Sequence, residues 1–196
     1  MILFTAGHPF AGKTELVKLL VASYRDTTVI DPTNLRPPEY AQMTPADQAS
    51  ARIAAWEVSL EMLTEAMNKP DKDLVIFDTC GAKSSAMLQQ FVNAKAKKHK
   101  VFYVFVGAPM KDCQKRAGTL WPRPEVIQGY SKDFLESVPK LRTASDRFLF
   151  VKNTQDEARI ALKSAAGRIV RAINDINEAN RIPKPVTAHN PASRTR

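Results

Sequence analysis

The sequence predicts an α/β fold: a five-stranded parallel sheet with helices on both faces and a short lid. Strand-like apolar runs alternate with segments of helical periodicity over the first 180 of the 196 residues. Parallel strands joined by crossover helices produce this order. The longest run, Val101–Val106, is aliphatic or aromatic at every position, as expected of a strand that is covered on both faces.

Five strands are expected. Each is a short run rich in β-branched, aliphatic or aromatic residues, which favour strands. The first stops at a glycine, and the second and third end at aspartates. In chain order the expected strands are residues 2–6, 28–31, 74–77, 101–106 and 148–151.

Five helices are expected, and the second has the clearest start. Thr44 can cap it, Pro45 suits its first turn, and Asp47 lies three residues after the cap. Residues 35–43 before it have the composition of proline-rich coil, and residues 118–129 are expected to form an irregular lid. The expected helices are residues 13–25, 45–68, 83–98, 110–117 and 156–179.

The charge of the chain favours a polyanionic partner. Lys and Arg number 29 against 20 Asp and Glu, which leaves a formal net charge of +9. An excess of this size is typical of proteins that bind nucleic acid, and we expect DNA as a partner. Solubility alone is the alternative explanation.

The chain is expected to divide into a folded domain, residues 1–180, and a disordered tail, residues 181–196. The tail contains three prolines and no acidic residue, which indicates an extended basic segment. Its basic residues are Arg181, Lys184, Arg194 and Arg196.

The composition also bears on the cellular compartment. No apolar run approaches the roughly 18 residues that a membrane-spanning helix needs, so no membrane partner is expected. The N-terminus has no basic lead-in of the kind that secretory signals carry. Cys80 and Cys113 are the only cysteines and indicate neither a disulfide framework nor a zinc site. We therefore expect a cytoplasmic protein.

Residues 7–14, GHPFAGKT, match the phosphate-binding pattern G-x-x-x-x-G-K-[ST] at every fixed position. The pattern lies between an expected strand and an expected helix, which is its required context. Gly7 and Gly12 let backbone N–H groups close around phosphate oxygens. Lys13 is expected to reach the β- and γ-phosphates of ATP and Thr14 to bind Mg²⁺. The positions that complete the nucleotide-binding loop are His8, Pro9, Phe10 and Ala11.

Two aspartates follow neighbouring strand signals. Asp78 ends the run Leu74–Phe77, where an acid can hold the magnesium of a phosphate-binding loop. Asp31 ends the second strand. Ligands of an open parallel sheet gather at the carboxyl ends of its strands, so both acids can face one site. One would hold the metal and the other, Asp31, would accept the proton of an attacking hydroxyl.

Basic residues complete the expected site. Arg36 is a candidate for binding a phosphate of the acceptor through its forked guanidinium. Arg116 and Arg123 flank the expected lid and are candidates for neutralising charge in the transition state. Lys111 and Lys115 are expected to be solvated.

A second motif has a simpler explanation. Residues 153–156, NTQD, have the N-x-x-D spacing of a guanine reader. However, a helix that begins there also favours Asn, Thr and Asp. The chain has no recognisable switch segment either, so a GTPase is disfavoured.

Together, residues 7–14, Val29–Asp31 with Arg36, and Ile76–Thr79 resemble segments of small P-loop kinases, most closely the polynucleotide kinase and zeta-toxin group. The resemblance covers about residues 1–79, and it implies a P-loop kinase fold with ATP and Mg²⁺ as cofactors. In that group an aspartate beyond the second strand activates the acceptor, and a basic residue follows three positions later. Here Arg36 follows Asp31 by five positions.

The chain also looks like the phage kinases that phosphorylate 5-hydroxymethyluracil within DNA during thymine hypermodification. This resemblance implies a kinase that acts on a hydroxyl carried by DNA. A 5′-hydroxyl polynucleotide kinase and a small-molecule kinase of the zeta-toxin or nucleotide-kinase kind are alternatives. A nucleotide-dependent binding protein without transfer activity is an alternative from another class.

Overall fold

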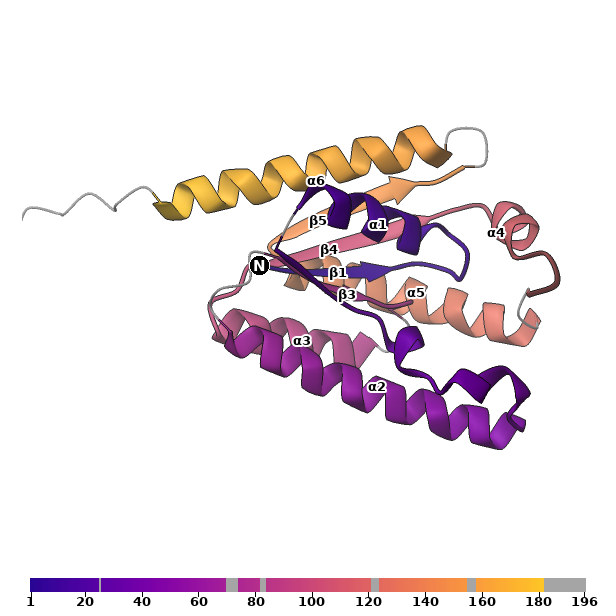
Figure 1. Cartoon of the computed structure of the whole chain (residues 1–196). Coiled ribbons are helices and arrows are strands. Elements are labelled where there is room, and N and C mark those ends of the chain that lie inside the picture. Colours follow the sequence, from indigo (N-terminus) through magenta and orange to yellow (C-terminus); the bar gives the residue numbers. More distant parts are fainter. Residues whose placement is uncertain (25, 70–73, 82–83, 121–123, 155–157, 182–196) are drawn as a thin grey trace, which may run out of the picture.

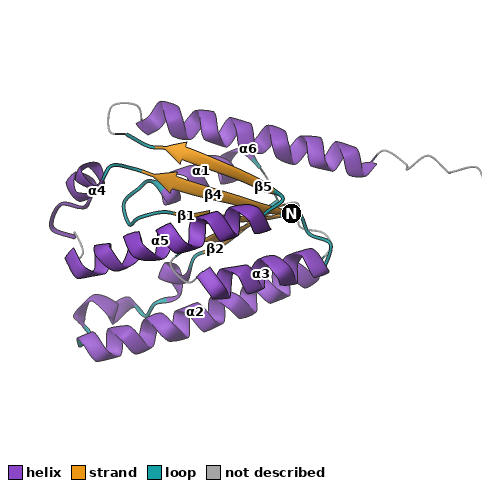
Figure 2. Cartoon of the chain, turned by 180° about the vertical axis from the view of Figure 1, so that it is seen from behind, coloured by secondary structure: helices purple, strands orange, loops and turns teal. Residues whose placement is uncertain are grey.

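A computed structural model describes residues 1–24, 26–69, 74–81, 84–120, 124–154 and 158–181 (Figures 1 and 2). Its centre is a five-stranded parallel sheet in the order β2-β3-β1-β4-β5. This confirms the predicted sheet, with strand ends shifted by a residue at most. The strands are β1 (Ile2–Ala6), β2 (Thr27–Ile30), β3 (Leu74–Asp78), β4 (Val101–Gly107) and β5 (Arg147–Lys152).

Helices cover both faces of the sheet, as predicted. The helices α1 (Lys13–Ser23) and α6 (Ala158–Arg181) pack on one face. The helices α2 (Pro45–Asn68), α3 (Ser84–Ala96) and α5 (Pro124–Ala144) lie on the other (Figure 2).

The two faces have separate hydrophobic cores because strand residues alternate between them. In the central strand β1, Leu3 joins the α1 and α6 core, whereas Ile2 and Phe4 join the core beneath α2 and α3. All three side chains have no exposed surface. A sheet buried in this way fixes where its strands end, and thus where the loops that carry polar groups begin.

Helix α5 was not predicted from the sequence. Residues 124–129 were expected to be irregular, but they form its first turns. Gly129 and Pro139 obscured the helix, because glycine and proline both disfavour helix interiors. The signal that could have revealed it is the spacing of Ile127, Phe134 and Leu141, which are all buried at seven-residue intervals.

The remaining short elements lie at the carboxyl ends of the strands. The expected coil before α2 contains two short 3₁₀ helices, η1 (Pro32–Leu35) and η2 (Pro38–Gln42). Helix α2 begins as predicted, with the N–H of Asp47 donating to Thr44 Oγ1 at 3.3 Å. After β4 come α4 (Met110–Ala117) and η3 (Gly118–Leu120).

Helix α6 continues through Arg181, the first residue of the predicted tail. Residues 182–196 lie outside the described residues. Within the described ranges, no helix has both the length and the apolar character needed to cross a membrane.

Candidate functional site

The loop between β1 and α1 has a backbone that requires its two glycines. Gly7 and Gly12 have φ values of +139° and +101°, a region that side chains disfavour. A Cβ on Gly7 would lie 2.2 Å from the carbonyl oxygen of Val106, and one on Gly12 would lie 2.3 Å from Asn153 Nδ2. The loop is therefore tightly packed against β4 and against the residue that follows β5.

Lys13, the first residue of α1, folds back over this loop. Its Nζ donates hydrogen bonds to the carbonyl oxygens of Gly7, at 2.9 Å, and His8, at 3.0 Å. Burial lowers the pKa of the Lys13 amine, and the nearby carboxylate of Asp78 counteracts that shift. The ammonium is thus enclosed by the loop, where a phosphate oxygen would stabilise its charged form.

Asp78 connects the central strands to the same loop. Its buried carboxylate accepts hydrogen bonds from Thr5 Oγ1 on β1 and from the Thr14 side chain on α1. Burial raises the pKa of Asp78, partly offset by the Thr5 hydrogen bond and the charge of Lys13. The structure thus brings Thr14 and Asp78 together. Their hydroxyl and carboxylate are the hard oxygen donors that Mg²⁺ prefers.

Asp31 lies immediately after β2 and faces this group. Its charge raises the pKa values of both Asp78 and Lys13, which places it within electrostatic reach of both. Its Oδ1 accepts hydrogen bonds from Thr33 N and Thr33 Oγ1, both at 2.7 Å, so the carboxylate also caps η1. Asp31, Asp78, Lys13 and Thr14 therefore gather at the carboxyl edge of the sheet.

The loop after β3 supports this arrangement. Cys80 O accepts a hydrogen bond from Gly7 N at 3.2 Å, and Thr79 N donates to Thr5 Oγ1 at 3.2 Å. Gly81 has φ +73°, and a Cβ there would lie 2.5 Å from the Cβ of Ala6. Hydrogen bonds therefore hold the loop that follows β3 against the phosphate-binding loop and β1.

Arg116, predicted as a lid residue, instead forms hydrogen bonds with the phosphate-binding loop and with Asn153. We call Arg116 and Asn153, which both donate to the backbone of this loop, the loop brace. Arg116 Nη1 donates to Phe10 O at 3.2 Å and its Nη2 to Asn153 O at 3.2 Å. The Asn153 side chain is 1% exposed and donates from Nδ2 to Ala11 O at 2.6 Å. From the sequence, Asn153 was expected to act as a base reader or a helix cap, because its contact with Ala11 spans 142 positions.

We expect Asn153→Ala to destabilise this brace. Ala11 O is buried and would lose its short hydrogen bond, which should lower the free energy of unfolding by about 1–3 kcal/mol. Chemical denaturation measures this loss. The matched control is Asn34→Ala, because Asn34 is exposed. If the two substitutions lowered the free energy of unfolding equally, the hydrogen bond from Asn153 to Ala11 would not stabilise the loop.

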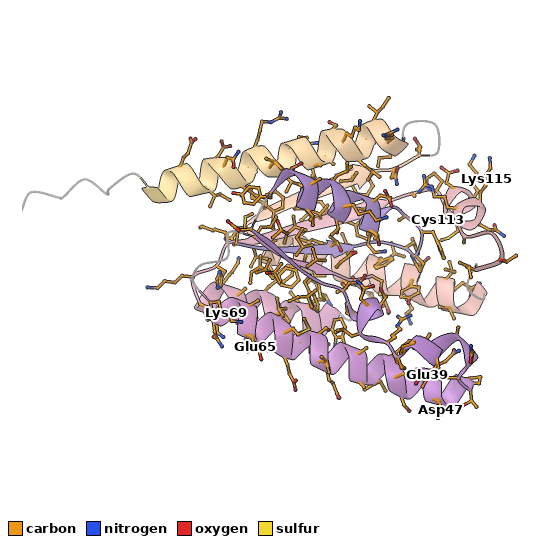
Figure 3. The ribbon with its side chains drawn as sticks, in the orientation of Figure 1. Glu39, Asp47, Glu65, Lys69, Cys113 and Lys115 are labelled. Atoms are coloured by element: carbon orange, nitrogen blue, oxygen red, sulfur yellow. The ribbon has the colours of Figure 1, made fainter. Side chains whose placement is uncertain are left out.

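The other predicted lysines and arginines occupy different places. Lys111 and Lys115 are exposed on α4 as expected, and Lys115 projects from its outer side while Cys113 lies toward the sheet (Figure 3). Arg123 lies outside the described residues. Arg36 follows η1, with its guanidinium over the Tyr40 ring at 4.8 Å.

Helix α5 contributes contacts that sequence analysis missed. Ser131 Oγ lies 3.5 Å from His8 Nε2, and the Phe134 ring packs edge-on against the His8 imidazole, 4.8 Å between centroids. Burial and the charge of Lys13 lower the pKa of His8. His8 therefore links the phosphate-binding loop to α5, and its lowered pKa favours the neutral imidazole.

The Thr5 hydroxyl should set the pH range of the site. If the Asp78 carboxylate holds Mg²⁺ beside the nucleotide, binding should weaken as the pH falls through the raised pKa of Asp78. Thr5→Val removes a hydrogen bond to the charged form, raises this pKa further and should shift the acid midpoint of binding to higher pH. Nucleotide affinity measured across pH with Mg²⁺ tests this. Thr27→Val is the control, since the Thr27 hydroxyl donates to Tyr24 O, and an unchanged midpoint in Thr5→Val would refute the assignment.

Comparison with known proteins identifies the fold. No family model and no curated protein matches the sequence. Solved structures do match. A Chloroflexus aurantiacus protein provisionally described as a kinase superposes with a TM-score of 0.64 and 12% identity, over 89% of this chain and 96% of that one.

Two shikimate kinases are also similar. The Acinetobacter baumannii protein, in complex with shikimate, has a TM-score of 0.57 and 14% identity, covering 93% of this chain and 95% of its own. The Bacteroides thetaiotaomicron protein has a TM-score of 0.55 and 18% identity, covering 89% of this chain and 98% of its own. The chain therefore has the P-loop kinase fold, as predicted.

Proposed function

We propose that this protein is a kinase that uses ATP and Mg²⁺ to phosphorylate a hydroxyl carried on DNA, specifically that of 5-hydroxymethyluracil. One observation carries the proposal of a kinase: Lys13, Thr14, Asp78 and Asp31 come from three different parts of the chain and gather beside one glycine-bounded loop. Phosphoryl transfer requires that a phosphate-binding loop, metal ligands and a base for the acceptor lie close together.

Each residue has a distinct role in this proposal. The residues of the loop, from Gly7 to Gly12, would hold the ATP phosphates, and Lys13 would bind the β- and γ-oxygens. Thr14 and Asp78 would hold Mg²⁺, which neutralises phosphate charge when bound. Asp31 would accept the proton of the acceptor hydroxyl.

The proposal of a DNA acceptor rests on the net charge of the chain and on the resemblance to phage DNA kinases. A net charge of +9 favours a polyanion. A base inside a duplex would have to leave the stack to reach the carboxyl edge of the sheet.

Labelled ATP provides the direct test. The protein is incubated with γ-labelled ATP and either 5-hydroxymethyluracil DNA or unmodified DNA, followed by nuclease digestion. Label on the modified base supports the proposal. Label on a 5′ terminus would instead indicate a polynucleotide kinase, and no label in either DNA would refute a DNA acceptor.

The fold of the two shikimate kinases favours a second candidate, a kinase for a small alcohol. It would share the catalytic residues and differ in the acceptor pocket. A panel of free nucleosides, nucleotide sugars and small alcohols, assayed with the same labelled ATP, separates the two candidates.

DNA binding should weaken steeply with salt. Residues 182–196 contain Lys184, Arg194 and Arg196. If each neutralises one phosphate, their replacement by serine should reduce the slope of log affinity against log salt by about 2 to 3. Fluorescence anisotropy at several salt concentrations measures the slope. An identical slope in the triple variant would remove the tail from the DNA interface.

A further inference from the structure

Two arginines meet at a tyrosine on the acceptor side of the site. The Arg36 guanidinium carbon lies 4.8 Å from the centroid of the Tyr40 ring, and Arg52 Nη1 on α2 donates to the Tyr40 hydroxyl at 3.1 Å. We call Arg36, Tyr40, Arg52 and the facing Tyr130 of α5 the arginine cluster. Only Arg36 of this cluster was singled out from the sequence.

The segment that carries Tyr40 is held against α2. Gln48 Nε2 donates to Tyr40 O at 3.1 Å and to Met43 O at 3.3 Å, which ties the η2 segment to the helix. The Tyr40 ring thus holds one guanidinium against its face and the other at its hydroxyl. Positions fixed in this way are suited to bidentate recognition.

Tyr130 lies within electrostatic reach of both arginines of the cluster. Burial and a hydrogen bond with Cys80 raise the pKa of Tyr130 to about 12, and the nearby charges of Arg36 and Arg52 oppose that shift. Cys80 in turn accepts, at its carbonyl, the hydrogen bond from Gly7. The cluster therefore borders the phosphate-binding loop and lies at the end of the molecule where Glu39 and Asp47 project (Figure 3).

Among the described residues, no carboxylate forms an ion pair with the arginines of the cluster. The ion pairs found in the described part of the chain are Lys18–Glu15 and Lys95–Asp146, and neither involves the cluster. Arg36 Nε is buried and has no hydrogen-bond partner among the residues that the structure describes. A buried donor without an acceptor is costly, so an occupant that supplies an oxygen there would be stabilising.

We propose that Arg36 and Arg52 form an oxyanion subsite that binds a phosphate group of the acceptor, while Asp31 faces its hydroxyl. The inference rests on the proposed kinase function and narrows it to acceptors that carry a phosphate beside the reacting alcohol. A nucleotide and an internal DNA phosphodiester share this chemistry. The forked donors suit either, because a guanidinium binds two phosphate oxygens at once.

The experiment compares matched acceptors. 5-Hydroxymethyldeoxyuridine, its 5′-monophosphate, and a trinucleotide with the modified base at its centre are phosphorylated with labelled ATP. The wild type should prefer the phosphate-bearing acceptors, and Arg52→Ala should reduce that preference by tenfold or more. Arg159→Ala is the control for charge, because Arg159 is exposed on α6. Preference for the monophosphate indicates a nucleotide, whereas preference for the trinucleotide indicates DNA.

A binding measurement separates this inference from the kinase function. Thymidine monophosphate and thymidine are titrated into the protein while a non-hydrolysable ATP analogue and Mg²⁺ fill the phosphate-binding loop. The subsite predicts tighter binding of the monophosphate and loss of that difference in Arg36→Ala and Arg52→Ala, even if no acceptor is phosphorylated. An unchanged ratio in both variants would overturn the subsite, whether or not transfer occurs.

Discussion

Lys13→Ala is expected to reduce kcat for phosphoryl transfer by roughly a hundred- to a thousandfold. The Lys13 ammonium is enclosed by the phosphate-binding loop, 2.9 Å from Gly7 O and 3.0 Å from His8 O. Removing one preorganised donor from a site of transition-state charge costs about this much. Single-turnover transfer with labelled ATP measures the effect.

The fold should survive this substitution. Alanine suits the first turn of α1, and the variant no longer buries a charge whose pKa is lowered by burial. Lys18→Ala is the matched control on the same helix. Lys18 is exposed and forms a surface ion pair with Glu15, so its loss should change kcat and stability little. A Lys13→Ala variant with wild-type kcat would refute the assignment of the loop.

Asp31→Asn is expected to reduce transfer to the acceptor by roughly a hundredfold or more, while ATP still binds. Asparagine retains an oxygen that can accept the hydrogen bond from Thr33 N, but it cannot take up a proton. ATP affinity and acceptor phosphorylation, measured on the same preparation, separate the two effects. A nucleotide-dependent binding protein would keep its function in this variant.

Thr33→Ala tests whether the loss of transfer in Asp31→Asn comes from losing the cap of η1 rather than from losing the base. It removes the hydroxyl that donates to Asp31 Oδ1, yet it leaves the carboxylate in place. We expect a much smaller loss of transfer than in Asp31→Asn. Similar losses in the two variants would assign Asp31 a structural role as the cap of η1.

Local signals were sufficient to predict the sheet and the phosphate-binding loop. The strands are short apolar runs covered on both faces, and the loop has fixed spacing between its glycines and Lys13. The proximity of Asp31 and Asp78 also followed from position, because both come at the carboxyl ends of neighbouring parallel strands. Such inferences need only the alternation of strands and helices.

Contacts between distant segments were not predictable in this way. The hydrogen bonds that Arg116 makes to the loop depend on how α4 packs, and the bond from Asn153 to Ala11 depends on β5. Helix α5 was missed because Gly129 and Pro139 mask its periodicity. With α5 unrecognised, the contacts of Tyr130 and Ser131 with the site could not be anticipated.

The first turns of α5 have a thermodynamic consequence. The consecutive residues Tyr130 and Ser131 have different neighbours in the site: Tyr130 lies near Cys80 and the arginines, and Ser131 lies beside His8. Neighbouring residues of one helical turn move together. If a ligand displaced this turn from one part of the site, affinity in the other part would change, and reciprocity would require the two ligands to change each other's dissociation constants by the same factor.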